Sequence, residues 1–201
     1  MYDHMEKKDA LKVKVILGSI RPGRFSEHPG RWILGIAKQI EGVETELLDL
    51  RNYQMPFYEE PVSPATDKTA GLKKDPVKRW SEKIEEADGF IIVTPEYNHG
   101  YSAVLKNALD YVWYPWNKKP VAFVAYGNAG GARSVEQLRE VAVELEMHAI
   151  RRAVHIPSPW NLVGKDNVLK EGAFDPYSDT AKKMLEELVS WTKALKAVRE
   201  T

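Results

Sequence analysis

A loop rich in glycine, serine and arginine follows the first apolar run of the chain, and its residue types suit a phosphate group. After the run 13–17 comes loop one (residues 18–26), Gly18-Ser19-Ile20-Arg21-Pro22-Gly23-Arg24-Phe25-Ser26. Guanidinium and hydroxyl groups, with free backbone N–H groups at a helix N-terminus, bind phosphate well. We expect loop one to hold the phosphate of a nucleotide-like cofactor, with Ser26 also in position to cap the next helix.

Loop one by itself leaves an alternative open, namely an ordinary strand-to-helix turn with solvated arginines. Two other nucleotide-binding motifs are missing from it. No Gly-Lys-Ser or Gly-Lys-Thr follows, as a Walker loop requires, and the dinucleotide pattern Gly-x-Gly-x-x-Gly does not occur there.

A second polar loop follows the apolar run 89–94. Loop two (residues 94–101) reads Thr-Pro-Glu-Tyr-Asn-His-Gly-Tyr. Tyr97 can cover an aromatic ligand, and Asn98 can bind ring heteroatoms. In the alternative interpretation, loop two is a simple turn and Asn98 caps the next helix. His99 could pair with Ser102, Glu96 or Asp110, but the five histidines lack metal-ligand spacing, so we do not expect a metal site.

A third loop is rich in glycine. Loop three (residues 126–134) reads Tyr-Gly-Asn-Ala-Gly-Gly-Ala-Arg-Ser. Glycine allows a flat ring to approach the main chain closely. One such loop is weak support for a ligand site, whereas three loops at one edge of a sheet are stronger support.

The chain alternates apolar runs with helix-periodic segments. The pattern predicts an α/β fold, a flavodoxin-like three-layer sandwich with a parallel five-stranded sheet in the order 2-1-3-4-5 and helices on both faces. Loops one, two and three then meet at the carboxyl edge of the sheet. We expect Asp75 to cap a helix, a flexible extension at 1–11 and one domain at 12–201. Strands are expected at 13–17, 44–50, 89–94, 121–126 and 150–156.

Composition narrows the class of protein. The 201 residues contain 29 Lys and Arg, 29 Asp and Glu, and no cysteine. The balanced charge gives no indication of nucleic-acid or membrane-surface binding. The lack of cysteine excludes disulfides and thiolate chemistry within the chain. Since we find neither a signal peptide nor a membrane-spanning run, we expect a soluble cytoplasmic protein.

Several motifs together resemble the NAD(P)H-dependent FMN reductases of the flavodoxin-like fold, which include quinone, azo-dye and chromate reductases. The resemblance covers about residues 12–157. Its motifs are Gly18-Ser19-Ile20-Arg21 with Ser26, Leu47-Leu48-Asp49-Leu50, Met55-Pro56-Phe57-Tyr58-Glu59-Glu60, Thr94-Pro95-Glu96-Tyr97-Asn98, Leu105-Lys106-Asn107-Ala108-Leu109-Asp110 and Gly127-x-x-Gly130-Gly131.

The resemblance implies a role for each loop. Loop one would hold the FMN phosphate, loop two would border the isoalloxazine, and loop three would lie near its pyrimidine side. The candidate cofactor-binding residues are Ser19, Arg21, Arg24, Ser26, Pro95, Glu96, Tyr97, Asn98, Gly127, Gly130 and Gly131. One departure concerns Glu27-His28, where the family commonly has asparagine after the serine. A carboxylate beside a phosphate is unfavourable unless it points away.

By the same resemblance, hydride would pass from NADPH or NADH through flavin N5 to quinone-like, azo, metal-oxyanion or free-flavin acceptors. The flavin carries this chemistry, so we name no catalytic side chain. The alternatives are a flavodoxin-like electron carrier, a non-enzymatic regulatory domain on the same fold, and a hydrolase that uses Ser102 or Ser134.

Two irregular segments, 51–74 and 158–177, are candidates for shaping the acceptor pocket, if necessary across a subunit interface. Four aromatic residues between them fit either a core or an interface. Because the resemblance implies a homodimer or homotetramer, we favour an interface for Tyr111, Trp113, Tyr114 and Trp116.

Overall fold

A parallel sheet forms the central layer of the protein, whose computed structural model describes residues 10–201. Its order is β2-β1-β3-β4-β5, and every neighbouring pair is parallel. The predicted order is therefore confirmed. The strands are β1 (Leu11–Leu17), β2 (Val43–Asp49), β3 (Gly89–Pro95), β4 (Pro120–Gly127) and β5 (His148–Pro157).

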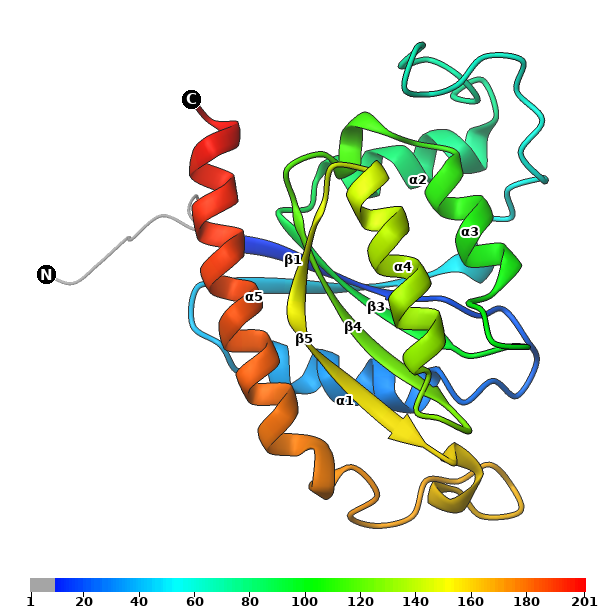
Figure 1. Ribbon diagram of the computed structural model, residues 1–201, viewed down its shortest axis with the longest axis vertical. Helices are drawn as coiled ribbons and strands as arrows, with labels where there is room; N and C mark the ends of the chain where they lie inside the picture. Colours follow the sequence, from blue (N-terminus) through cyan, green and yellow to red (C-terminus); the bar gives the residue numbers. More distant parts are fainter. Residues whose placement is uncertain (1–9) are drawn as a thin grey trace, which may run out of the picture.

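Helices cover both faces of the sheet, as Figure 1 shows. The helices α1 (Glu27–Ala37) and α5 (Ser178–Arg199) pack on one face. The other face is covered by α2 (Asp75–Glu85), α3 (Ala103–Asp110) and α4 (Ala132–Glu144). Short 3₁₀ turns lie at η2 (Leu50–Asn52), η3 (Tyr114–Trp116), η4 (Pro159–Leu162) and η5 (Asp175–Tyr177).

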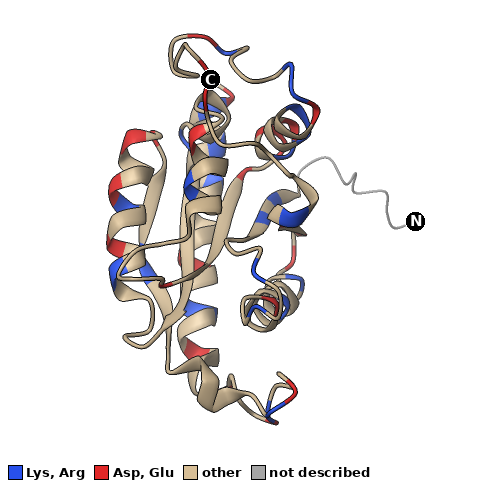
Figure 2. Ribbon diagram, turned by 90° about the vertical axis from the view of Figure 1, so that its right-hand side faces the viewer, with Lys and Arg blue, Asp and Glu red and all other residues tan. Residues whose placement is uncertain are grey.

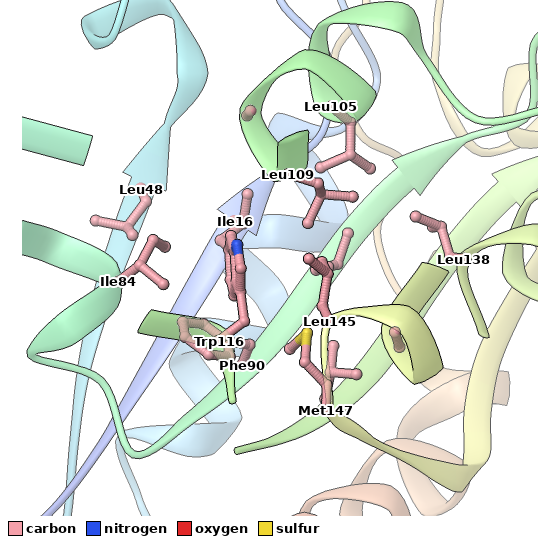
Figure 3. Packing of buried hydrophobic residues seen from close by; sticks show 14 of the residues in the cluster. Ile16, Leu48, Ile84, Phe90, Leu105, Leu109, Trp116, Leu138, Leu145 and Met147 are labelled. Atoms are coloured by element: carbon pink, nitrogen blue, oxygen red, sulfur yellow. The ribbon is translucent and has the colours of Figure 1, made fainter. Parts of the chain in front are cut away.

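The aromatic cluster that we favoured as an interface is divided between core and surface. Trp116 is fully buried and packs edge-on against Phe90, with ring centroids 4.8 Å apart (Figure 3). Tyr111 is also fully buried, whereas 36% of Tyr114 is exposed. The interface interpretation is thus wrong for Tyr111 and Trp116, because the face of the sheet under α2 and α3 needs large rings to fill it.

One prediction about a helix start is wrong, and one alternative interpretation is excluded. Lys74, not Asp75, occupies the N-cap of α2, and the Asp75 carboxylate instead accepts a bond from Arg79 Nε at 3.0 Å. Helix α3 is capped by Ser102, whose Oγ accepts from the Leu105 N–H, so Asn98 does not cap it. Aspartate in a first helical turn is favourable without capping, because it interacts with the helix dipole.

Asp88, directly before β3, joins the two ends of the described chain. Its carboxylate accepts hydrogen bonds from the Lys12 backbone N–H at 3.0 Å, Lys196 Nζ at 3.2 Å and Arg199 Nη2 at 2.7 Å. This junction lies at the amino edge of the sheet, opposite the loops that follow the strands.

Charged residues of both signs are interspersed along the helices in Figure 2, and the strands between them are mostly uncharged. Within residues 10–201, no helix is long and apolar enough to span a membrane.

Candidate functional site

A cavity of about 420 Å³ lies where the strands end, and all three loops contribute to it. The segment 158–177 forms the rest of its wall. The expected convergence of the loops is therefore present in the structure. The lining residues are Arg21, Gly23, Arg24, Phe25, Pro95, Glu96, Tyr97, Tyr126, Gly127, Asn128, Pro159, Trp160, Val163 and Asn167.

Loop one turns sharply at Gly23, whose φ of +64° favours glycine, and then enters α1. Ser26 occupies the N-cap position of α1 and is fully buried. Its hydroxyl makes no capping hydrogen bond, so the expectation that the Ser26 side chain caps the helix is wrong. Ser26 Oγ is left available for another partner.

Arg24 is buried behind loop one, with 3% of its surface exposed. Its guanidinium donates to both Asp49 oxygens, Nη1 to Oδ1 at 2.9 Å and Nη2 to Oδ2 at 2.5 Å. It also donates to the Ser19 carbonyl. Such a two-pronged pair fixes both the position and the plane of the guanidinium. Arg24 therefore ties loop one to the end of β2.

Glu27 follows Ser26, and its carboxylate faces two arginines. It accepts from Arg51 Nη2 at 2.6 Å and from Arg24 Nη2 at 3.2 Å. Burial opposes its ionisation, but the hydrogen bonds and charges of Arg51 and Arg24 prevail and lower the pKa of Glu27. The negative charge beside the expected phosphate position is thus neutralised by Arg24 and Arg51.

Asp49 completes this charged network. Burial would raise the pKa of its carboxyl, but hydrogen bonds from Arg24 and Arg51 outweigh burial and hold that pKa far below its usual value of 3.8. The carboxylate therefore stays ionised throughout the physiological range. Asp49 belongs to one of the sequence motifs, but the sequence indicates no role for it, because its partner Arg24 lies 25 positions away in the chain.

Buried polar atoms without partners gather around loop one. Among residues 10–201, six buried side-chain polar atoms lack a hydrogen bond, and four of them belong to Arg24 (Nε), Ser26 (Oγ), His28 (Nε2) and Tyr126 (Oη). Tyr126 lies beside the loop, since its ring packs on Phe25 with centroids 5.1 Å apart. Burial raises the pKa of Tyr126, and the neighbouring Ser26 hydroxyl opposes that shift only in part, so the Tyr126 hydroxyl remains a proton donor.

Unpartnered buried donors are costly, so their clustering calls for an acceptor that satisfies them. The Arg24 N–H and the hydroxyls of Ser26 and Tyr126 can each donate to a phosphate oxygen. This donor set fits the phosphate of FMN.

Loop two forms a tight turn that joins loop one. Tyr97 and Gly100 exchange backbone hydrogen bonds of 2.8 and 3.0 Å, with Asn98 (φ 49°) and His99 (φ 70°) between them. Positive φ at both central positions is typical of a type I′ turn and suits asparagine. The Tyr97 hydroxyl lies 2.9 Å from Ser19 Oγ, so the two loops are in direct contact.

Glu96 is engaged by the start of α4. Its nearly buried carboxylate accepts from Arg133 Nε at 2.7 Å and from the Arg133 backbone N–H at 3.2 Å. Arg133 Nη1 also lies 2.9 Å from His99 Nε2. Although Glu96 lines the cavity, its charge is used to attach loop two to α4.

The two serines of the hydrolase alternative are used structurally. Ser102 Oγ donates to the Gly18 carbonyl, and Ser134 Oγ donates to the Pro95 carbonyl at 3.0 Å. Both side chains are buried. Within residues 10–201, no cluster of three His, Asp or Glu side chains could hold a metal ion.

The glycines of loop three differ in their surroundings. Gly127 lines the cavity, whereas Gly130 and Gly131 are absent from its lining. A Cβ on Gly131 would lie 2.6 Å from Ala125 Cβ, and one on Gly130 would lie 3.0 Å from His155 Cβ. Both have positive φ. Close packing of the loop on β4 and β5 therefore explains why glycine stands at these two positions.

Asn107 belongs to one of the sequence motifs and positions the segment 51–74, a role that the motif itself does not indicate. Its Nδ2 donates to the Pro56 carbonyl at 2.7 Å, and its Oδ1 accepts from the Tyr58 N–H at 2.9 Å. An asparagine on the otherwise apolar inward face of α3 is the signal that could have revealed it. Asn107 fixes the segment 51–74, which contributes no residue to the cavity wall.

Comparisons with known proteins identify the family of this chain. Residues 11–161 match the family model described as NADPH-dependent FMN reductase. An NAD(P)H-dependent FMN reductase of Schizosaccharomyces pombe is 34% identical over 165 residues, which cover 82% of this chain and 79% of that protein. A quinone reductase of Escherichia coli is 34% identical over 146 residues, covering 69% and 72% respectively.

Solved structures show the same fold. The flavoenzyme NAD(P)H:acceptor oxidoreductase FerB of Paracoccus denitrificans aligns with a TM-score of 0.69 at 21% identity, covering 92% of this chain and 98% of FerB. A flavodoxin variant of Pseudomonas aeruginosa aligns with a TM-score of 0.54 at 15% identity, covering 89% of this chain and 99% of the flavodoxin. From the extent of the family match and the identity to the curated relatives, the chain belongs to the NADPH-dependent FMN reductase family.

Proposed function

We propose that this protein is an FMN-dependent oxidoreductase that uses NADPH or NADH to reduce small electron acceptors. The cluster of unpartnered buried donors around loop one is the observation that carries the assignment of FMN to this cavity. Membership of the family supports the use of a reduced nicotinamide nucleotide. In the overall reaction, NAD(P)H, a proton and a quinone give NAD(P)⁺ and a hydroquinone.

The residues around the cavity would bind and orient the cofactor. We assign the phosphate to the donors of Arg24, Ser26 and Tyr126, with Ser19 and Arg21 at the same loop. Asp49 and Glu27 hold Arg24 in place and balance its charge. FMN, when bound, accepts hydride from the nicotinamide and passes reducing equivalents to the acceptor.

Loops two and three would enclose the ring system. We assign this role to Pro95, Glu96, Tyr97 and Asn98 of loop two, and to Gly127 of loop three. Four of these five line the cavity, whereas Asn98 lies in the adjoining turn. Gly130 and Gly131 act through the shape of loop three, because they allow its backbone to pack on β4 and β5.

The relatives support a particular class of acceptor. Curated proteins similar to this chain include an NAD(P)H:quinone oxidoreductase of Solanum tuberosum, 33% identical over 153 residues. We propose quinones as the principal acceptors, with azo compounds, metal oxyanions and free flavin as further candidates.

We also propose a cytoplasmic location and a homodimer or homotetramer. An enzyme that consumes NAD(P)H must work where metabolism regenerates that nucleotide, which supports the location. Exposed apolar residues, including Phe57 with 79% of its surface exposed, support association with another copy. We treat residues 12–201 as one FMN-binding domain, with no nucleic-acid or membrane partner.

The function is tested by the visible spectrum of the purified protein, followed by NADPH oxidation with added FMN and 1,4-naphthoquinone. We expect saturable FMN binding and quinone-dependent loss of NADPH absorbance. Absence of both would refute the proposal. FMN binding without NADPH oxidation would instead indicate an electron carrier.

The position of the phosphate is tested by Arg21→Ala. Arg21 is exposed and lines the cavity, so a charge-assisted bond to phosphate accounts for its placement. Its loss should weaken FMN binding by about 1.5–3 kcal/mol, as measured by quenching of flavin fluorescence. Arg31→Ala, at an exposed position of α1 outside the cavity, is the matched control and should leave the affinity unchanged. Equal affinities of the two variants would show that the phosphate lies elsewhere.

A further inference from the structure

Trp160 has an unusual environment for a tryptophan. It lines the cavity, yet 58% of its surface is exposed, more than for any of the other five tryptophans in the chain. Burial of an exposed indole against a flat ring is favourable, because large apolar surface leaves water and aromatic rings attract one another. An exposed tryptophan in a cavity wall is therefore suited to binding a ligand.

The backbone around Trp160 is fixed at both ends. The Ser158 N–H donates to the Gly127 carbonyl at 2.9 Å, which attaches the turn η4 to loop three. On the other side, Lys170 donates through its backbone N–H to Leu162 and through Nζ to the Asn161 carbonyl, at 2.9 and 2.8 Å. The indole is thus carried by a backbone that is held in place before any ligand arrives.

Aromatic packing also anchors the segment 158–177. Phe174 is 5% exposed and stacks on Trp32 of α1, with ring centroids 4.9 Å apart. It also packs edge-on against Phe25 of loop one at 6.3 Å. The wall that carries Trp160 therefore rests on loop one and α1, the elements to which we assign the phosphate.

The chemistry of this wall favours a flat apolar ligand. Trp160, Pro159 and Val163 present apolar surface. The charged cavity residues belong to loop one (Arg21 and Arg24) and loop two (Glu96) instead. The family match covers residues 11–161, so Pro159 and Trp160 lie inside it and Val163 and Asn167 lie beyond it. Since loops two and three are assigned to the flavin ring, the apolar face of Pro159 and Trp160 is left for the electron acceptor.

We propose that Trp160 is a specificity-determining residue that stacks against the ring of an aromatic acceptor, a quinone, during its reduction. This proposal rests on the proposed oxidoreductase function. The reaction is unchanged: the quinone gains a hydride equivalent from NAD(P)H and a proton from water, and leaves as the hydroquinone. The indole acts by binding alone and takes no part in electron or proton transfer.

The experiment compares two acceptors on the FMN-loaded protein with saturating NADPH. 1,4-Naphthoquinone has an aromatic face, whereas ferricyanide has none, and each NADPH reduces two ferricyanide ions with release of one proton. In Trp160→Ala the KM for naphthoquinone should rise about tenfold and that for ferricyanide should stay the same. Trp160→Phe, which keeps an aromatic face, should restore most of the naphthoquinone affinity.

A matched control is available on α5. Trp191 is 40% exposed and packs on His148 with ring centroids 4.0 Å apart, on an element that contributes nothing to the cavity wall. Trp191→Ala should leave both KM values unchanged. It removes an exposed indole of comparable size, so a general effect of tryptophan loss would appear in this variant too.

A second readout needs no turnover. Oxidised naphthoquinone, titrated into the FMN-loaded protein without NADPH, should quench tryptophan fluorescence in a saturable manner. The saturable part should disappear in Trp160→Ala and persist in Trp191→Ala. A fluorescence titration with FMN on the protein freed of flavin should give the same dissociation constant for wild type and Trp160→Ala.

Three results would overturn the proposal. The first is an equal change in KM for naphthoquinone and for ferricyanide. The second is saturable quenching that survives in Trp160→Ala. The third is a tenfold loss of FMN affinity in that variant, which would assign the indole to the cofactor. A wild-type protein that oxidises no NADPH with either acceptor would refute the proposed function instead. The quenching titration would still decide whether Trp160 binds the quinone.

Discussion

Loop one and the segment 158–177 form two parts of the same cavity wall, but different forces hold them. Loop one is fixed by Arg24, whose buried guanidinium pairs with Asp49 and Glu27. The segment 158–177 is fixed by Phe174, which packs between Trp32 and Phe25. The ionic part suits a ligand of fixed charge, and the apolar part suits ligands that share only a flat shape.

From this comparison we predict that truncating a side chain of the apolar part lowers the free energy of unfolding more than truncating one of the ionic part. Phe174→Ala should lower the free energy of unfolding by about 4 kcal/mol, since it empties a buried aromatic site. Urea unfolding followed by circular dichroism measures the change. Lys182→Ala, at an exposed position of α5, is the control and should cost less than about 0.5 kcal/mol. Similar losses in both variants would contradict the packing described for Phe174.

The ionic part should respond next. Asp49→Ala leaves the Arg24 guanidinium buried without its main partner and should cost about 3 kcal/mol in the same unfolding experiment. Asp75→Ala removes an exposed pair with Arg79 and should cost less than about 1 kcal/mol. If the two substitutions cost the same, the Arg24–Asp49 pair does not stabilise loop one.

Loop three connects loop one and the segment 158–177, and a substitution at Gly131 tests how rigid that connection is. Gly131→Ala places a methyl group 2.6 Å from Ala125 Cβ and forces alanine to a φ of +75°. The expected cost is about 2 kcal/mol. Gly35→Ala, in the middle of α1 with open space around it, should stabilise the protein by about 0.5 kcal/mol. Opposite signs for two Gly→Ala changes would identify packing and backbone strain as the cause.

Of the two parts of the wall, only the ionic part should lose stability in acid, and this is the smallest of the effects that we predict. The folded-state pKa of Asp49 lies below its unfolded value of 3.8. The contribution of its carboxylate to the free energy of unfolding is therefore complete above about pH 5 and is lost as the pH falls below that value. The stability difference between wild type and Asp49→Asn should therefore narrow by about 1 kcal/mol between pH 6 and pH 3, after allowance for solvent screening. An unchanged difference across this range would show that the pair does not titrate as described.

Hydrophobic periodicity predicts the strands and helices, because burial repeats along each of them with a local period. The alternation of these elements then predicts the sheet order and the three converging loops. It could not reveal that Glu27 faces Arg51, since nothing local connects residues 24 positions apart. The role that we propose for Trp160 was equally hidden, because the segment that carries it has no periodic pattern. The misassigned cap at Asp75 is a smaller error: α2 begins one residue earlier than predicted, so Asp75 lies in its first turn and Lys74 occupies the N-cap.

Asp88 has a consequence for protein engineering. Its single carboxylate contacts both Lys12 and Arg199, so the start of β1 and the end of α5 lie within one side chain's reach. A short linker could join them and give a circularly permuted enzyme, with new ends opened in the segment 51–74. Fusion partners attached there would leave the cavity wall intact, because that segment contributes no residue to it.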